Sequence, residues 1–128
     1  MKLSAIAGLL ADDLSPQQFL AECASELAER RELVGGDGQV LKRGSVVPVR
    51  VSDDCAISVS RQGVATLCRH FVRGDLSTVD LAYIADALQL AEDVSWEDEN
   101  VAELVAEFTD PEINGVFTVA RAREIAGA

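Results

Sequence analysis

The sequence contains few of the residues on which catalysis, metal binding and disulfide frameworks depend. Its 128 residues include one histidine, one tryptophan and three cysteines at irregular spacings, Cys23, Cys55 and Cys68. A single imidazole excludes catalysis that needs several, and an odd number of cysteines predicts free thiols rather than a set of disulfides. With 48% hydrophobic and 26% charged residues, the composition is typical of a globular domain and not of a disordered chain.

Long apolar runs are also missing. No stretch approaches the roughly 18 consecutive apolar residues of a membrane-spanning helix. The apolar start of the chain runs directly into Asp12 and Asp13, whereas a secretory signal needs a longer apolar core followed by a small-residue cleavage site. We therefore expect one cytoplasmic domain over residues 1–128, with no membrane contact, no cofactor and no metal.

Basic residues are scarce and unevenly placed. The chain has 11 Lys and Arg against 22 Asp and Glu, which gives a net charge of −11. Residues 74–120 contain twelve acidic residues and no basic one, whereas residues 38–73 contain six basic and two acidic residues. This balance argues against nucleic acid or an anionic membrane surface as the direct ligand, and it favours a basic protein partner.

Within the acidic stretch, like charges stand at helical spacing. Glu103 has Glu99 four residues before it and Glu107 four residues after it, so all three fall on one face of a helix. Each such pair costs a helix about 0.2–0.5 kcal/mol, and mixed charges would serve helix stability better. One interpretation is a solvated face that aids solubility, and the other is a dedicated binding surface.

The only tryptophan, Trp96, stands among carboxylates and is expected in a loop or in the first turn of a helix. An aromatic side chain surrounded by charges has the composition of an interface hot spot with an electrostatic rim. The alternative is a residue that covers one end of the helical bundle. The predicted partner-binding residues are Asp93, Trp96, Glu97, Asp98, Glu99, Glu103 and Glu107.

Apolar residues recur at helical spacing along most of the chain, and capping residues mark where helices begin. Ser15, followed by Pro16 and Gln18, starts a helix that is expected to continue to about Val34, before the glycines at 35–38. The same signals predict helix starts after Ser60, Ser77 and Thr118. Core-facing positions include Phe19, Leu27, Leu67, Cys68, Leu88, Leu90, Leu104, Val119 and Ala122. We expect a mainly α fold, a single-domain bundle of about five helices.

Residues 46–59 have a different pattern. Valines surround Pro48, and Ile57 and Val59 alternate with serines, which is typical of extended chain. The dipeptide Asp53-Asp54, between the valine-rich run and the run of Ile57 and Val59, predicts the turn of a short β-hairpin. Pro48 limits the first run to an edge strand or an extended segment.

Candidate catalytic and metal-binding groups are isolated from one another. Cys68 and His70 are two residues apart on a predicted helix and so lie on different faces. Cys68 belongs to the apolar stripe and is expected to be a buried structural thiol, whereas His70 is expected at the boundary or surface. Residues 110–121 partly match a calcium-binding loop, but Arg121 stands where the bidentate glutamate is needed. We predict no catalytic residue and no metal site.

Three segments carry a family resemblance: residues 74–77 (Gly-Asp-Leu-Ser), 83–88 (Tyr-Ile-Ala-Asp-Ala-Leu) and 109–115 (Thr-Asp-Pro-Glu-Ile-Asn-Gly). Together they make residues 60–120 similar to small helical bacterial proteins that resemble the immunity proteins of contact-dependent or colicin-type toxin systems. The resemblance implies a cytoplasmic inhibitor that binds a toxin domain and blocks its active site or a nearby surface. Toxic nucleases are typically basic, which suits the acidic stretch.

Two functions are therefore weighed. The first is an immunity-type inhibitor that binds a basic toxin domain stoichiometrically through its acidic surface. The second is a non-catalytic adaptor or self-associating helical module whose acidic face only aids solubility. Salt discriminates between them, because binding through an apolar face depends little on ionic strength.

Overall fold

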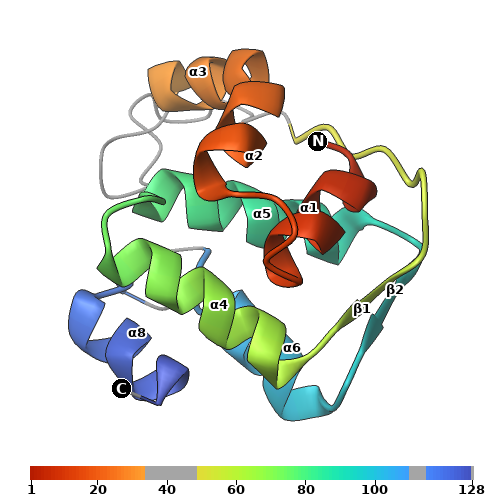
Figure 1. Ribbon diagram of the computed structural model, residues 1–128. Helices are drawn as coiled ribbons and strands as arrows, with labels where there is room; N and C mark the ends of the chain where they lie inside the picture. Colours follow the sequence, from red (N-terminus) through yellow and green to blue (C-terminus); the bar gives the residue numbers. More distant parts are fainter. Residues whose placement is uncertain (34–48, 110–114, 128) are drawn as a thin grey trace.

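The structure is a computed structural model that describes residues 1–33, 49–109 and 115–127 (Figure 1). In these ranges the protein has seven α-helices and two short β-strands, so the prediction of a mainly helical fold is confirmed. The predicted turn over residues 110–114 and the glycines at 35–38 lie outside the described residues. In chain order the elements are α1 (Leu3–Leu10), α2 (Pro16–Glu22), α3 (Ala24–Leu33), β1 (Ile57–Val59), α4 (Arg61–Val72), α5 (Thr78–Leu90), β2 (Val94–Trp96), α6 (Glu99–Ala106) and α8 (Val119–Ala126).

Serine and threonine caps start four of the helices, as the sequence predicts. The side-chain oxygens of Ser15, Ser60, Ser77 and Thr118 each accept a hydrogen bond from the backbone N–H three residues further on. Gly74, just after the last residues of α4, has a φ of 82°, a conformation that glycine adopts without steric cost. Local sequence therefore fixes where these helices begin and where α4 ends.

The helix expected from residue 16 to about residue 34 is divided into α2 and α3 at Cys23. At Cys23 the backbone leaves helical geometry, with a φ of −107° and a ψ of 13°. The division has a tertiary reason. Helix α2 packs on α1, whereas α3 packs on α5. One straight helix would not make both contacts. This division raises the number of helices above the expected five.

One hydrophobic core contains buried residues from all seven helices and from β1, consistent with the single domain that was expected. Helix α5 runs through the middle of the molecule and contacts α3 and α4, while α1 packs on α4 (Figure 1). Leu88 is buried but Leu90 is 60% exposed, contrary to expectation, because residues two apart on a helix point in different directions. Val119 is 41% exposed, also contrary to expectation, since α8 faces the core with Ala122, Ile125 and Ala126.

The predicted β-hairpin is wrong. Strand β1 pairs in parallel with β2, in the register Ile57 with Val94 and Val59 with Trp96, and α4 and α5 form the connection between them. Val49 and Val51 are not part of a strand, and residues 46–48 lie outside the described residues. A parallel partner more than 30 residues away leaves no local signal in a sequence, whereas a hairpin does.

Asp53 and Asp54 were expected in the hairpin turn. Instead, their carboxylates accept hydrogen bonds from backbone segments that are distant in the sequence. Asp54 accepts a hydrogen bond from the backbone N–H of Ser4 at 2.9 Å, which caps α1 from another part of the chain. Asp53 accepts hydrogen bonds from the backbone N–H groups of Glu92 and Asp93 at 3.0 and 3.2 Å. The two carboxylates thus tie the segment before β1 to the start of α1 and to the start of β2.

A partly buried polar network holds α3 and α5 to the chain start. The Met1 ammonium lies 2.6 Å from Glu26 Oε2 and donates to the carbonyl oxygen of Arg50 at 2.7 Å. The Tyr83 hydroxyl donates to the same Glu26 oxygen at 2.7 Å and accepts from the backbone N–H of Arg50 at 3.0 Å. Among the described residues, every helix is too short or too polar to cross a bilayer.

Candidate functional site

Trp96 lies in β2, and not in a loop or a first helical turn as the sequence predicts. Successive residues of a strand face opposite sides, so Val94 and Trp96 share the face of Ile57 and Val59, which are both buried. The Trp96 ring is half-buried against the hydrophobic core. Trp96 therefore covers the edge of the core and also keeps part of its surface at the solvent.

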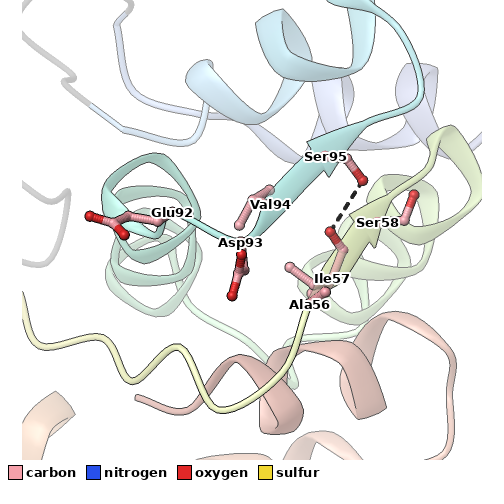
Figure 2. Close-up of a pocket in the computed structure, with 7 residues that line it drawn as sticks. All are labelled: Ala56, Ile57, Ser58, Glu92, Asp93, Val94 and Ser95. Carbon is pink, nitrogen blue, oxygen red and sulfur yellow. Dashed lines mark hydrogen bonds between the residues drawn. The ribbon is translucent and has the colours of Figure 1, made fainter.

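The outer face of the two-stranded sheet forms a shallow groove of about 430 Å³ (Figure 2). Ser58 and Ser95, which are paired and exposed, lie on this face, and Ser95 Oγ donates to the carbonyl oxygen of Ile57 at 3.4 Å. Glu92 and Asp93 line the groove at the start of β2, and Figure 2 shows their carboxylates directed away from the strands. Ala56, Ile57 and Val94 also line the groove, so it combines two hydroxyls with an apolar lining and a border of negative charge.

This outer face is not covered by any of the residues that the structure describes. Parallel sheets occur almost always with both faces covered, because strands of this type are usually packed between helices. Here α1 contacts β1 and α6 contacts β2, while Ser58 and Ser95 remain exposed. The sheet is thus an exposed platform, and sequence analysis did not find it because the pairing of residues 57–59 with 94–96 is long-range.

Glu97 and Asp98 are exposed but are held by the start of α4. Glu97 Oε2 accepts a hydrogen bond from the backbone N–H of Arg61 at 2.7 Å. Asp98 caps α6 by accepting from the backbone N–H of Val101 at 2.9 Å, and its other carboxylate oxygen lies 3.5 Å from the Arg61 guanidinium. These two carboxylates therefore have structural roles. The ion pair between Asp98 and Arg61 is exposed, so it neutralises the charge of Asp98 only weakly.

Glu99 and Glu103 extend the negative charge along α6. Both are exposed, and neither has a hydrogen bond or an ion pair with another described residue. We call residues 92–103 the acidic segment. Its six exposed carboxylates belong to Glu92, Asp93, Glu97, Asp98, Glu99 and Glu103.

Glu107, also predicted to bind the partner, differs from Glu99 and Glu103 because its carboxylate is paired within the molecule. Its carboxylate forms a two-point ion pair with Arg121 of α8, with distances of 2.8 Å to Nε and 2.9 Å to Nη2. Arg121 also donates to Glu124 at 3.0 Å, and these hydrogen bonds raise the pKa of the Arg121 guanidinium. The sequence could not show this pairing because Glu107 and Arg121 belong to different helices.

The prediction that Cys68 is buried is confirmed, and the prediction that His70 lies at the boundary or surface is wrong. Cys68 is fully buried, as expected, and burial raises the pKa of its thiol to about 12, so the thiol is protonated at neutral pH. Burial likewise raises the pKa of Cys23 to about 11. His70, expected at the boundary or surface, is only 5% exposed, and its Nε2 lies 3.9 Å from the carboxylate of Asp12 in the turn after α1.

The described residues contain no group of three or more His, Cys, Asp and Glu side chains placed to hold a metal ion. The first positions of the partial calcium-loop pattern, residues 110–114, lie outside the described ranges. Arg121 of that pattern is occupied by Glu107 and Glu124. The acidic segment offers exposed carboxylates that can bind positive charge. No family model, curated protein or solved structure matches this chain.

Proposed function

We propose that this protein is a non-catalytic binding protein that takes a basic protein partner on its acidic segment, and that the partner is a toxin domain which it inhibits. The observation that carries the proposal is the acidic segment itself. Within residues 92–103 the six exposed carboxylates have one arginine, Arg61, as an ion-pair partner among the described residues. A surface with this much unpaired negative charge is complementary to a basic protein.

Trp96, on the inner face of the sheet beside the acidic segment, adds an apolar anchor. Trp96 is half-buried in β2, next to the first carboxylates of the segment and next to Glu97. Tryptophan is enriched among the residues that dominate binding energy, where a rim of charges excludes water around it. The half-exposed ring gives a partner a desolvated contact that carboxylates alone do not provide.

The mechanism that follows is stoichiometric occlusion. Glu99 and Glu103 would contact lysines and arginines of the partner, and Trp96 would pack against its surface. The field of the acidic segment raises the association rate, on the order of 10 to 1,000-fold for steered pairs, and the gain falls steeply with salt. For a nuclease toxin, the lysines and arginines so covered are those that bind its nucleic acid substrate.

The test uses the tagged full chain as bait for proteins of its own source, at low and at moderate salt. Glu99→Lys combined with Glu103→Lys changes the charge by four units on the acidic segment. Asp13→Lys combined with Glu22→Lys makes the same change at exposed positions on the turn after α1 and on α2, and serves as the matched control. We expect a single basic protein retained one-to-one, released by salt, and bound at least about 10-fold more weakly by the acidic-segment variant alone.

Inhibition is then measured directly, by producing the retained protein in cells with and without the wild-type chain. Restored growth supports the inhibitor, and loss of that protection in the acidic-segment variant supports the surface. Equal binding by both double variants would show that the acidic segment is not the interface. Retention of the bait chain alone, at any salt, would instead identify a self-associating module whose acidity serves solubility.

A further inference from the structure

A second charged feature lies on the opposite side of the molecule and has the opposite sign. A small cleft of about 120 Å³ is lined by three arginines. Arg69 and Arg73 lie at the end of α4, and Arg123 lies in α8. Val72 and Ala126 complete its lining. In Figure 1, α8 and the end of α4 lie at one side of the molecule and the β1–β2 sheet lies at the other.

The three guanidinium groups have no carboxylate partner among the described residues. The other arginines whose side chains are described all have one. Arg50 pairs with Glu29 at 3.5 Å, Arg61 with Asp98 at 3.5 Å, and Arg121 with Glu107 at 2.8 Å. The chain has 22 acidic and 11 basic residues, yet three arginines and no acidic residue line this cleft.

Helix geometry does not account for the arrangement. Cations near helix C-termini are favoured by the helix dipole, and Arg69 and Arg123 lie in the last turns of their helices. Arg69 and Arg73, however, are four residues apart on α4, which places two positive charges on the same face at a cost to the helix. Arg123 adds a third positive charge from the neighbouring helix, and a carboxylate at any of these positions would relieve the repulsion.

One of the three groups is already fixed in position. The Arg69 guanidinium donates to Thr66 Oγ1 at 3.1 Å, and Thr66 Oγ1 donates to the carbonyl oxygen of Gln62 at 3.1 Å. Thr66 is buried, so the hydroxyl that holds Arg69 has a fixed place in α4. Fixing the side chain before binding reduces the entropy that a ligand must overcome.

We propose that the cleft between Arg69, Arg73 and Arg123 binds the phosphoryl group of a small phosphorylated ligand. A phosphoryl group has three acceptor oxygens and close to two negative charges at neutral pH, and guanidinium groups bind it in two-point contacts. The volume of the cleft suits one such group and not a whole nucleotide. The apolar side chains of Val72 and Ala126 lower the local polarity and so strengthen these contacts.

The experiment titrates the isotope-labelled protein with inorganic phosphate at pH 7.5, at constant ionic strength, and follows the arginine Nε–Hε signals by NMR. We expect saturable shifts of Arg69, Arg73 and Arg123 but not of Arg50. Arg73→Gln and Arg123→Gln should each weaken phosphate binding by about 10-fold or more. Arg50→Gln is the matched control, because it removes one positive charge from an exposed pair elsewhere and should leave the affinity unchanged.

Three results would overturn the proposal. The first is a shift that grows linearly with phosphate and does not saturate. The second is an equal loss of affinity in Arg50→Gln and Arg123→Gln, which would show that net charge and not the cleft attracts phosphate. The third is acetate binding as tightly as phosphate, which would assign the cleft to a carboxylate. Addition of a phosphate monoester with a small alkyl group distinguishes free phosphate from an organic phosphate, which should bind more tightly over Val72 and Ala126.

Discussion

Individual residues in this protein hold the fold through buried polar contacts. Glu26 is the clearest case, since its carboxylate receives both the Met1 ammonium and the Tyr83 hydroxyl. Met1 and Tyr83 are almost fully buried residues, and the ammonium faces two oxygens, one of Glu26 and the carbonyl oxygen of Arg50. A partly buried charge depends strongly on the opposite charge beside it.

We therefore predict that Glu26→Gln lowers the free energy of unfolding by about 2–3 kcal/mol, since it removes the carboxylate charge from two hydrogen bonds and leaves the ammonium with neutral acceptors only. Urea denaturation measures the loss. Glu29→Gln is the control, because Glu29 pairs with Arg50 at the surface and such pairs contribute about 0–1 kcal/mol. Equal losses in the two variants would contradict the role given to Glu26.

His70 links stability to pH. Both ring nitrogens are buried and have no hydrogen-bond partner among the described residues. Burial lowers the pKa of His70, and the positive charges of Arg73 and Arg69 act in the same direction, while Asp12 and Asp75 oppose them. In the unfolded chain His70 binds a proton near pH 6.5, whereas in the folded chain it does so only at lower pH. The free energy of unfolding therefore decreases as the pH falls below about 6.5.

The predicted slope is at most about 1.4 kcal/mol per pH unit for this one group. His70→Leu removes the titrating group and keeps the side chain apolar. Denaturation of both proteins between pH 7.5 and 5.5 should show the wild type losing stability relative to the variant. A difference that is constant across this range would mean that His70 titrates alike in the folded and unfolded chains.

At the scale of elements, side-chain ion pairs and carboxylate caps join segments that are far apart in the sequence. Asp54 caps α1, Asp53 fixes the start of β2, and Glu97 meets the first residue of α4. Glu107 of α6 and Arg121 of α8 form the corresponding link on the other side of the molecule. Several acidic residues that the sequence marks only as negative charge are thus structural.

We predict that Glu107→Gln loosens α8 and leaves partner binding unchanged. The partly exposed pair should contribute about 0.5–1 kcal/mol, and its loss should speed hydrogen exchange in α8 more than in α5. Glu103→Gln, one turn earlier on α6 and unpaired among the described residues, is the comparison. Weaker partner binding in Glu107→Gln than in Glu103→Gln would restore Glu107 to the interface and contradict the structural role.

The whole molecule is polarised in charge. The acidic segment lies beside the sheet and the three-arginine cleft lies at α8, on opposite sides of the core (Figure 1). The net charge of −11 nevertheless dominates, and self-repulsion of this kind destabilises a compact chain. Salt screens the repulsion, so stability is expected to rise with ionic strength.

Glu99→Lys combined with Glu103→Lys should change the stability by less than about 1 kcal/mol at low salt. Glu103→Lys replaces the repulsion of Glu107 by attraction, a gain of about 0.5 kcal/mol. Glu99 lies in the first turn of α6, where the helix dipole favours an acidic residue, so Glu99→Lys costs about 0.3–1 kcal/mol. Thermal unfolding at two salt concentrations measures the sum, and a much larger loss would mean that these carboxylates are structural and not free for a partner.

The sequence by itself determined the helical class, most helix starts and the uneven charge. These depend on neighbouring residues: a capping serine acts on a backbone N–H three residues away, and apolar spacing follows the helix period. The acidic segment needed no more than a count of charges. Even the buried state of Cys68 follows from its place on a helical stripe.

The tertiary structure decided what depends on distant partners. Parallel pairing of β1 with β2 moved Trp96 from a loop to a strand and created the outer groove. Contact between α6 and α8 paired Glu107 with Arg121, and contact between α4 and α8 assembled the arginine cleft. The physical reason is the same in each case. Each of these contacts is formed by residues far apart in the sequence, and the local spacing of residues does not show which distant segment will pack against them.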